Sequence, residues 1–196
     1  MNWLAHLFLS PSVFEDRLGN VIADLIKGQQ RKNLNPRFNK GIQCHLLIDN
    51  FTDHHPVVKS SKRLMITQHR RYSGILVDIF YDHLLARNWN RYSKVSLSEF
   101  TTEIYDSFLH NFDEIPQTIN PLIKRMIDED WLGSYHEVLG IETTLTRIKR
   151  RLSIKHHRYF DVDKAMQQLE DDYSSFNDDF NVFFPQMIEH LEQNLV

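Results

Sequence analysis

The segment from Gly74 to Leu85 combines an apolar composition with ionisable side chains. Its pattern predicts a helix that is apolar nearly all the way round, which is typical of a buried helix. The segment nevertheless carries Asp78, Asp82 and His83, and the two acids are four residues apart, so they face the same side of the helix. An unpaired buried carboxylate is very costly. These acids therefore require cationic partners or a metal ion.

A second stripe with the same spacing consists of His45, Asp49 and Asp53. If the two helices face each other, they form a pocket of carboxylates and imidazoles, which is typical of a metal-dependent hydrolase centre. On spacing alone, each stripe could equally be a His–Asp hydrogen bond within one helix or a solvated polar face. The occurrence of both stripes in apolar helices favours the metal site.

Further ionisable residues extend the candidate site. Asp24 and His6 lie in apolar stretches, although a lone histidine in such a stretch is more often a hydrogen-bonded core residue. Asp53, His54 and His55 precede a proline, where a solvated helix end and a site remain equal alternatives. Carboxylates with some imidazole suit Mn²⁺ or Mg²⁺. The candidate metal ligands are Asp24, His45, Asp49, Asp78, Asp82 and His83, and the candidate acid–base residues are His83, Asp82 and His6.

A basic run lies between Arg147 and Arg158, with six Lys or Arg and two His in twelve residues. It is either a solvated helix face followed by a loop or a docking surface for an acidic partner or a phosphate. The docking surface would consist of Arg147, Lys149, Arg150, Arg151 and Lys155.

The bulk composition is that of an ordinary globular protein. The 196 residues suit a single domain with a sizeable core, and the net charge of −3 gives no general reason to expect nucleic-acid binding. The lone Cys44 excludes an intramolecular disulfide and a cysteine zinc motif. Since the sequence has neither a recognisable signal peptide nor an apolar run of membrane-spanning length, we expect a cytoplasmic protein that does not bind membranes.

Helical spacing dominates the sequence, so we predict one all-α domain, a helical bundle spanning residues 1–196. Ser96 and Glu99 form a capping box that opens a helix ending near residue 111. Gly140 is expected to separate two helices, and Pro185 to kink the last one. The other predicted helices cover residues 2–9, 19–27, 36–54, a segment after Pro56, 73–91, 122–128, 131–138, 141–152 and 161 to about 184.

Several short motifs, taken in order, resemble those of the acyl carrier protein phosphodiesterase family. They are Met1-Asn-x-Leu-Ala-His-Leu7, Gly19-Asn20 with Ala23-Asp24, Gly41-Ile42, His45-x-x-Ile-Asp49 with Thr52-Asp53, Asp78-x-x-x-Asp-His83 with Arg87 and Trp89, and Trp131-Leu132. The match extends over most of the chain.

The resemblance implies Mn²⁺-dependent hydrolysis of the phosphodiester that joins 4′-phosphopantetheine to a serine of holo acyl carrier protein. It also implies a fold likened to the all-α HD-type metallophosphohydrolases, although this sequence has no His-Asp dipeptide. Family members carry two arginines where this chain has Leu46 and Leu47. Two alternatives therefore stay open, which are a metallophosphohydrolase of small phosphoesters or nucleotides and a non-catalytic binder of the carrier protein.

Overall fold

The computed structural model describes residues 1–26, 28, 31, 34–156 and 160–195, and side chains are described for these residues except 154–156. This part of the chain contains ten α-helices and no strand, as the sequence predicts. The helices are α1 (Trp3–Leu9), α2 (Phe14–Leu25), α4 (Asn39–His54), α5 (Pro56–His69), α6 (Ser73–Arg87), α7 (Leu97–His110), α8 (Asn120–Asp128), α9 (Val138–His156), α10 (Val162–Asp171) and α11 (Tyr173–Asn194). Short 3-10 helices are η1 (Pro36–Phe38), η2 (Trp89–Arg91), η3 (Phe112–Glu114) and η4 (Gly133–His136).

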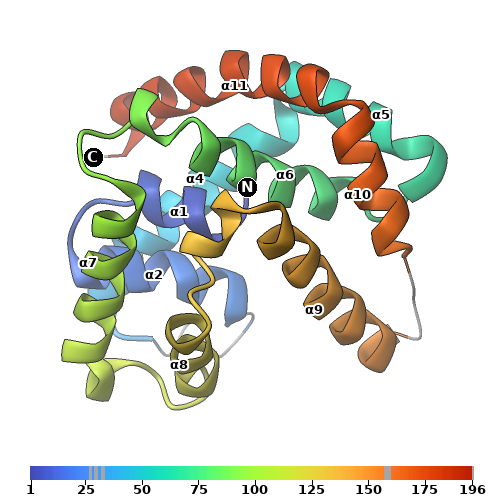
Figure 1. Ribbon diagram of the computed structural model, residues 1–196. Coiled ribbons are helices and arrows are strands. Elements are labelled where there is room, and N and C mark those ends of the chain that lie inside the picture. The colour runs from blue at the N-terminus through green and yellow to red at the C-terminus, as the bar shows by residue number, and fades with distance from the viewer. Residues whose placement is uncertain (27, 29–30, 32–33, 157–159, 196) are drawn as a thin grey trace.

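Helix α6 is the central buried helix of the fold. Every residue from Ile79 to Ala86 is buried, so the prediction of a helix enclosed on all sides is confirmed. Helices α1, α5, α9 and α11 pack around it, and α11 arches over it in Figure 1. Burial of each large apolar side chain contributes about 1.5–3 kcal/mol, so packing against the surrounding helices fixes the position of α6 and of the residues that it carries.

Helices α2 and α4 cross at very close range because glycines lie at their contact. A Cβ atom at Gly41 would overlap the carbonyl oxygen of Asp16, and one at Gly19 would overlap the carbonyl oxygen of Phe38. No other residue type fits these positions without moving the helices apart. This contact brings Asn20 on α2 next to His45 on α4.

The predicted helix boundaries are mostly confirmed, with four differences. The helix predicted over 131–138 is only the 3-10 helix η4, and Val138 already belongs to α9. The capping box of Ser96 and Glu99 is present at the start of α7. Helix α2 begins at Phe14, ahead of the predicted start. Gly140 lies inside α9 and does not separate two helices. A side chain at this position would overlap the carbonyl group of Ser134, so the glycine permits a close contact between α9 and η4. The last predicted helix is two helices, α10 and α11, which meet at Asp172.

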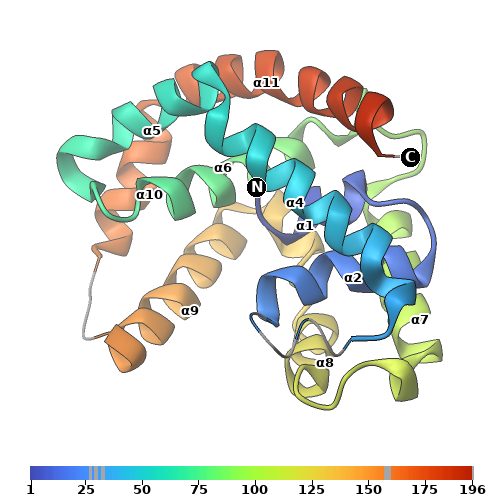
Figure 2. The same ribbon diagram turned by 180° about the vertical axis from the view of Figure 1, so that it is seen from behind.

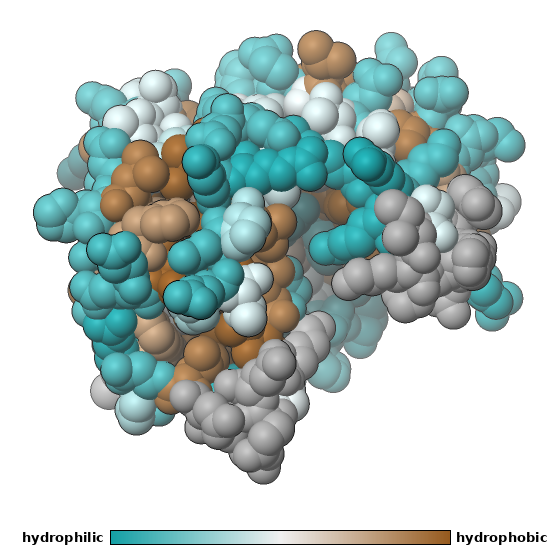
Figure 3. Space-filling model, turned by 90° about the horizontal axis from the view of Figure 1, so that it is seen from below, coloured by the Kyte–Doolittle hydropathy of each residue, from teal (hydrophilic) through white to brown (hydrophobic). Residues whose placement is uncertain are grey.

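The arrangement leaves α9 apart from α2 and α8, with the N-terminus between them in both views (Figures 1 and 2). In the view from below, the surface is hollowed between these two parts of the molecule (Figure 3). Among the described residues, no helix has the length and apolar character needed to span a bilayer.

Candidate active site

Two adjoining pockets lie where the N-terminal segment meets α2 and α9. The smaller has a volume of about 200 Å³ and the larger about 420 Å³. One set of side chains borders both pockets, so the two pockets are neighbours and are referred to together as the cleft. These shared residues are Asn2, Trp3, Asp24, Ile148 and Arg151.

Two histidines and a carboxylate form the polar cluster of the smaller pocket. His6 from α1 and His45 from α4 stack with ring centroids 4.5 Å apart. The carboxylate of Asp49 lies 3.0 Å from Nε2 of His45 and 3.4 Å from Nε2 of His6. Both imidazoles are buried, whereas the Asp49 side chain is 47% exposed. The cluster therefore has a carboxylate that solvent and a ligand can reach.

Asn20 sets the tautomers of both imidazoles. Its amide nitrogen donates to the carbonyl oxygen of His6 at 3.2 Å and to the hydroxyl of Ser10 at 2.8 Å, which fixes the orientation of the amide. Its Oδ1 atom then accepts from Nδ1 of His6 at 2.8 Å and from Nδ1 of His45 at 3.0 Å. Since an amide oxygen cannot donate, both rings carry a hydrogen on Nδ1. Both Nε2 atoms are left facing Asp49.

This arrangement places several hydrogen-bond acceptors beside one another. A neutral imidazole with its hydrogen on Nδ1 presents a lone pair at Nε2, and Asp49 presents carboxylate oxygens. Burial lowers the pKa of His6, and the nearby His45 lowers it further. The contact with Asp49 raises the pKa but does not outweigh burial. Burial opposes ionisation of Asp49, but the hydrogen bonds and positive charge that His45 and His6 provide once their Nε2 atoms are protonated outweigh it and hold the pKa of Asp49 well below its usual range. The cluster is thus satisfied only by a cation, which is either a proton or a metal ion.

Asp78 and Asp24 complete the acidic lining of the smaller pocket. Asp78, on α6, accepts a hydrogen bond of 2.8 Å from the Met1 ammonium group. Asp24, near the end of α2, is exposed and accepts a hydrogen bond of 3.4 Å from the indole of Trp3. The structure therefore brings four of the six predicted metal ligands, and the predicted acid–base residue His6, to one pocket. The four ligands are Asp24, His45, Asp49 and Asp78.

Asp82 has a different environment, which its spacing from Asp78 does not reveal. Its carboxylate is fully buried beneath the start of α1 and accepts backbone N–H groups of Asn2 at 3.0 Å, Leu4 at 2.8 Å and Ala5 at 3.4 Å. Burial raises the pKa of Asp82 to about 7, against the Met1 ammonium group and these donors. With its oxygens used in this way, Asp82 anchors α1 and does not line either pocket.

His83 also lies apart from the cluster. Its ring is buried, and its Nδ1 atom donates to the carbonyl oxygen of Tyr135 at 2.7 Å. Burial lowers the pKa of His83. His83 is not among the residues that line the two pockets, so the structure does not bring it together with His45 and Asp49.

The donor types of the smaller pocket fit a hard or borderline divalent ion, since carboxylates and imidazoles with free Nε2 atoms face one space. In the structure, Asp49 and the two imidazoles contact one another and do not surround a common point at which an ion could bind. Within the described residues, no three His, Cys, Asp or Glu side chains are already arranged as ligands of one ion.

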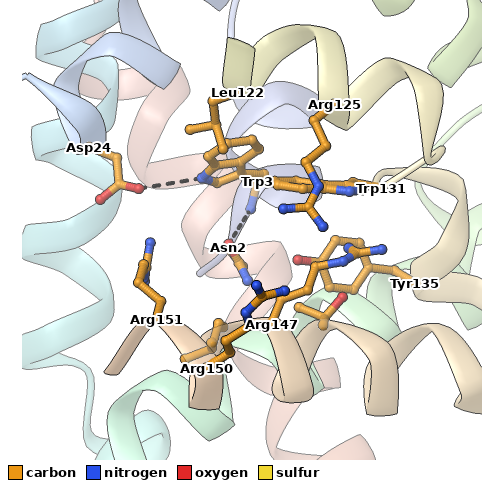
Figure 4. A pocket seen from close by; sticks show the side chains of 12 residues that line it. Asn2, Trp3, Asp24, Leu122, Arg125, Trp131, Tyr135, Arg147, Arg150 and Arg151 are labelled. Atoms are coloured by element: carbon orange, nitrogen blue, oxygen red, sulfur yellow. Dashed lines mark hydrogen bonds between the residues drawn. The ribbon is translucent and has the colours of Figure 1, made fainter. Parts of the chain in front are cut away.

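Arginines and tryptophans form the wall of the larger pocket (Figure 4). The rings of Trp3 and Trp131 are 5.5 Å apart, and the guanidinium groups of Arg147 and Arg125 lie 4.8 and 5.9 Å from the centroid of the Trp131 ring. Arg150 and Arg151 extend from α9 on the other side. The wall combines planar cation donors with aromatic faces, which suits a ligand with an anionic group and an uncharged part.

The comparisons with known proteins decide the family. The family model described as acyl carrier protein phosphodiesterase matches residues 1–187. The chain belongs to the acyl carrier protein phosphodiesterase family. The acyl carrier protein phosphodiesterase of Serratia proteamaculans is 31% identical over 193 residues, and the alignment covers 96% of this chain and 96% of the relative. That of Photorhabdus laumondii subsp. laumondii is 30% identical over 196 residues, and the alignment covers 98% of this chain and 96% of the relative. That of Escherichia coli O6:H1 is 28% identical over 193 residues, with 96% of both chains covered.

The resemblance noted in the sequence is thereby confirmed, and the chain is an enzyme of the acyl carrier protein phosphodiesterase family. No solved structure matches the chain, so the relation to HD-type metallophosphohydrolases stays a prediction. Leu46 is half-exposed on α4, and Leu47 packs partly against the core. Neither residue lines the two pockets.

The predicted basic surface of this phosphodiesterase-family chain is divided by the structure. Arg147, Arg150 and Arg151 line the larger pocket, whereas the half-buried Lys149 does not. The side chain of Lys155 lies outside the described residues. No role was predicted for Asn20, although Gly19-Asn20 is one of the motifs that resemble the family. Arg125 was missed altogether, because nothing in the sequence near α8 distinguishes this arginine from a solvated one.

Proposed function

We propose that this chain hydrolyses the phosphodiester between 4′-phosphopantetheine and the serine of holo acyl carrier protein, which gives apo acyl carrier protein and free 4′-phosphopantetheine. The family membership and the names of the relatives support this substrate. The observation that carries the proposal is that the pocket of the His6–His45–Asp49 cluster lies next to a pocket walled by arginines. Phosphodiester hydrolysis requires both a group that moves protons and cations that stabilise phosphoryl oxygens.

The arginines of α9 supply the cations. Arg151 borders both pockets, so its guanidinium group can contact a phosphate that lies between them. Guanidinium groups bind phosphate oxygens through two parallel N–H donors, which fixes the orientation of the phosphate as well as its charge. The exposed Arg150 and Arg151 would also attract the acidic carrier protein.

His6 is the residue suited to move a proton. Asn20 holds its Nδ1–H, so Nε2 is free to accept, and burial keeps the ring neutral around neutral pH. In the proposed reaction, Nε2 takes a proton from the attacking water as the new P–O bond forms. It then gives that proton to the serine oxygen as the old P–O bond breaks. Asp49 lies beside this nitrogen and stabilises the imidazolium between the two steps.

We propose that the reaction depends on Mn²⁺, with Mg²⁺ as the alternative. His45 and Asp49 would hold the ion, together with Asp24 or Asp78 from the same lining. When bound, the ion would lower the pKa of a water molecule and neutralise charge that develops on the phosphoryl oxygens.

Release of 4′-phosphopantetheine tests this proposal. Purified holo acyl carrier protein is incubated with the enzyme and Mn²⁺, or with EDTA, and the released product is separated by chromatography. We expect release with Mn²⁺ and none with EDTA. Hydrolysis of bis(p-nitrophenyl) phosphate without turnover of the carrier would instead favour a small-phosphoester hydrolase. Carrier binding without turnover at saturating Mn²⁺ would favour a non-catalytic binder.

A further inference from the structure

We infer that the larger pocket binds the pantetheine arm of the substrate, with Trp131 and Trp3 as the residues that contact it. This inference rests on the proposed function, because it assigns the part of the substrate that lies beyond the reacting phosphate. It gives the enzyme a means to recognise the released 4′-phosphopantetheine as well as the carrier protein.

Size separates the two pockets. Pockets that hold ligands of drug-like size measure ~300–1,000 Å³. The larger pocket, at about 420 Å³, falls in this range, whereas the smaller one, at about 200 Å³, falls below it. The smaller pocket therefore has room for a phosphoryl group and its water but not for a long arm. An arm attached to that phosphate must extend into the larger pocket.

The chemistry of the lining agrees with this division. The smaller pocket is lined by three carboxylates and two imidazoles, which are Asp24, Asp49, Asp78, His6 and His45. In the larger pocket Asp24 is the single carboxylate among the described lining residues, and Leu122, Ile148 and two indole rings provide apolar surface. The pantetheine arm is uncharged and alternates amide groups with hydrocarbon, including a gem-dimethyl group. Such an arm fits this pocket, because the apolar and indole surfaces can contact its hydrocarbon parts while the arginines that share the lining can donate hydrogen bonds to its amide oxygens.

Glu129 holds the tryptophan wall in place. Its carboxylate accepts hydrogen bonds from the indole nitrogen of Trp131 at 2.9 Å and from Nε of Arg125 at 2.7 Å, and it forms an ion pair with Arg147 at 3.1 Å. The two guanidinium groups also lie against the Trp131 ring. Trp131 is thereby oriented before a ligand arrives, and its remaining surface meets Trp3 and the pocket. Pre-oriented aromatic walls increase affinity because less side-chain freedom is lost on binding.

Binding of 4′-phosphopantetheine and of inorganic phosphate, measured by calorimetry, separates the arm from the anion. For the wild-type chain we expect 4′-phosphopantetheine to bind at least about tenfold more tightly than phosphate. In Trp131→Ala this advantage should disappear, while the affinity for phosphate stays within about twofold. Leu139→Ala is the matched control, since Leu139 is exposed on α9 and lines neither pocket. An advantage that persists in Trp131→Ala would overturn the inference.

Kinetics keep this inference separate from the proposed function. If wild type releases 4′-phosphopantetheine from holo carrier protein and Trp131→Ala does so with unchanged kcat/KM, the arm inference is wrong and the function stands. If the wild-type chain shows no turnover but binds 4′-phosphopantetheine in a Trp131-dependent way, the pocket assignment holds and the proposed function is wrong. Circular dichroism of each variant excludes unfolding as the cause of a loss, and Trp131→Phe, which keeps an aromatic face, should restore most of the affinity.

Discussion

The Oδ1 atom of Asn20 lies 3.0 Å from Nδ1 of His45 and so determines which nitrogen of this imidazole faces the cleft. Asn20 is fully buried, and the glycine contact between α2 and α4 brings it to this position. Asn20 therefore controls which nitrogen His6 and His45 present to the cleft, although its own side-chain groups are used in hydrogen bonds within the protein. The ring nitrogen that remains free is the one that a metal ion or a proton can occupy.

Replacing Asn20 should weaken metal binding without removing any ligand. In Asn20→Ala both imidazoles lose the acceptor that holds their Nδ1 hydrogens, and loss of such a partner typically costs about 10–100-fold in metal affinity. Calorimetric titration with Mn²⁺ measures the affinity, and nitrogen NMR of the histidine rings reports the tautomers. Asn50→Ala, at an exposed position of α4, is the control. Unchanged Mn²⁺ affinity in a folded Asn20→Ala variant would contradict this role.

His6 should contribute a pH dependence to stability. Because burial lowers its pKa in the folded chain below the ordinary value of 6.5, the unfolded chain takes up a proton first as the pH falls. The contribution of His6 is therefore constant well above pH 6.5 and lowers stability as the pH falls below it, by at most about 1.4 kcal/mol per pH unit. Urea unfolding between pH 7.5 and 5.5 should show a smaller decrease for His6→Gln than for wild type. If stability falls equally with pH in wild type and in His6→Gln, the pKa of His6 is the same in the folded and unfolded chains.

Asp82→Asn should lower stability because the carboxylate anchors α1. Asparagine has one acceptor oxygen and an amide group that cannot accept, so at least one of the backbone N–H groups of Asn2, Leu4 and Ala5 is left unpaired. We expect a loss of about 2–3 kcal/mol in the free energy of unfolding, measured with urea. Asp106→Asn, on the exposed face of α7, should change it by less than about 0.5 kcal/mol. Wild-type stability combined with lost turnover would instead place Asp82 in the chemistry.

Charge reversal on α9 should act through the cleft. Arg150→Glu together with Arg151→Glu should raise KM for the carrier protein and reduce the dependence of KM on salt, because both arginines line the larger pocket and attract an acidic partner. Lys149→Glu reverses a neighbouring charge that does not line the pocket, so its effect should be smaller. Steady-state kinetics from low to high salt measure both variants. An equal effect of Lys149→Glu would show that the whole face of α9, and not the cleft, attracts the carrier.

The residues that the sequence predicted correctly are those that periodicity and motif order can reveal. The burial of α6 follows from its apolar composition, and the four-residue spacing of His45 and Asp49 predicts their contact within one helix. The spacing of Asp78 and Asp82 correctly puts them on one face, yet it cannot show that backbone N–H groups of α1 meet that face.

Long-range contacts account for the features that the sequence did not reveal. Asn20, Arg125 and Trp131 reach the cleft from three separate elements, and their roles depend on how those elements pack. His83 sits one residue beyond Asp82 in the sequence, but the helix turns it toward the carbonyl group of Tyr135 and away from the pocket. The helical turn thus directs the adjacent residues Asp82 and His83 to different surroundings, and brings His83 next to Tyr135, which is distant in the sequence.

The proposed hydrolysis is tested most directly by the mass of purified holo acyl carrier protein after incubation with this chain and Mn²⁺, compared with an EDTA control and with His45→Ala. We expect the carrier to lose a mass equal to the phosphopantetheine group with wild type and Mn²⁺, and to keep its mass in both controls. An unchanged carrier mass with the folded wild-type protein and saturating Mn²⁺ would contradict the central claim. Full activity of His45→Ala would remove this histidine from the mechanism.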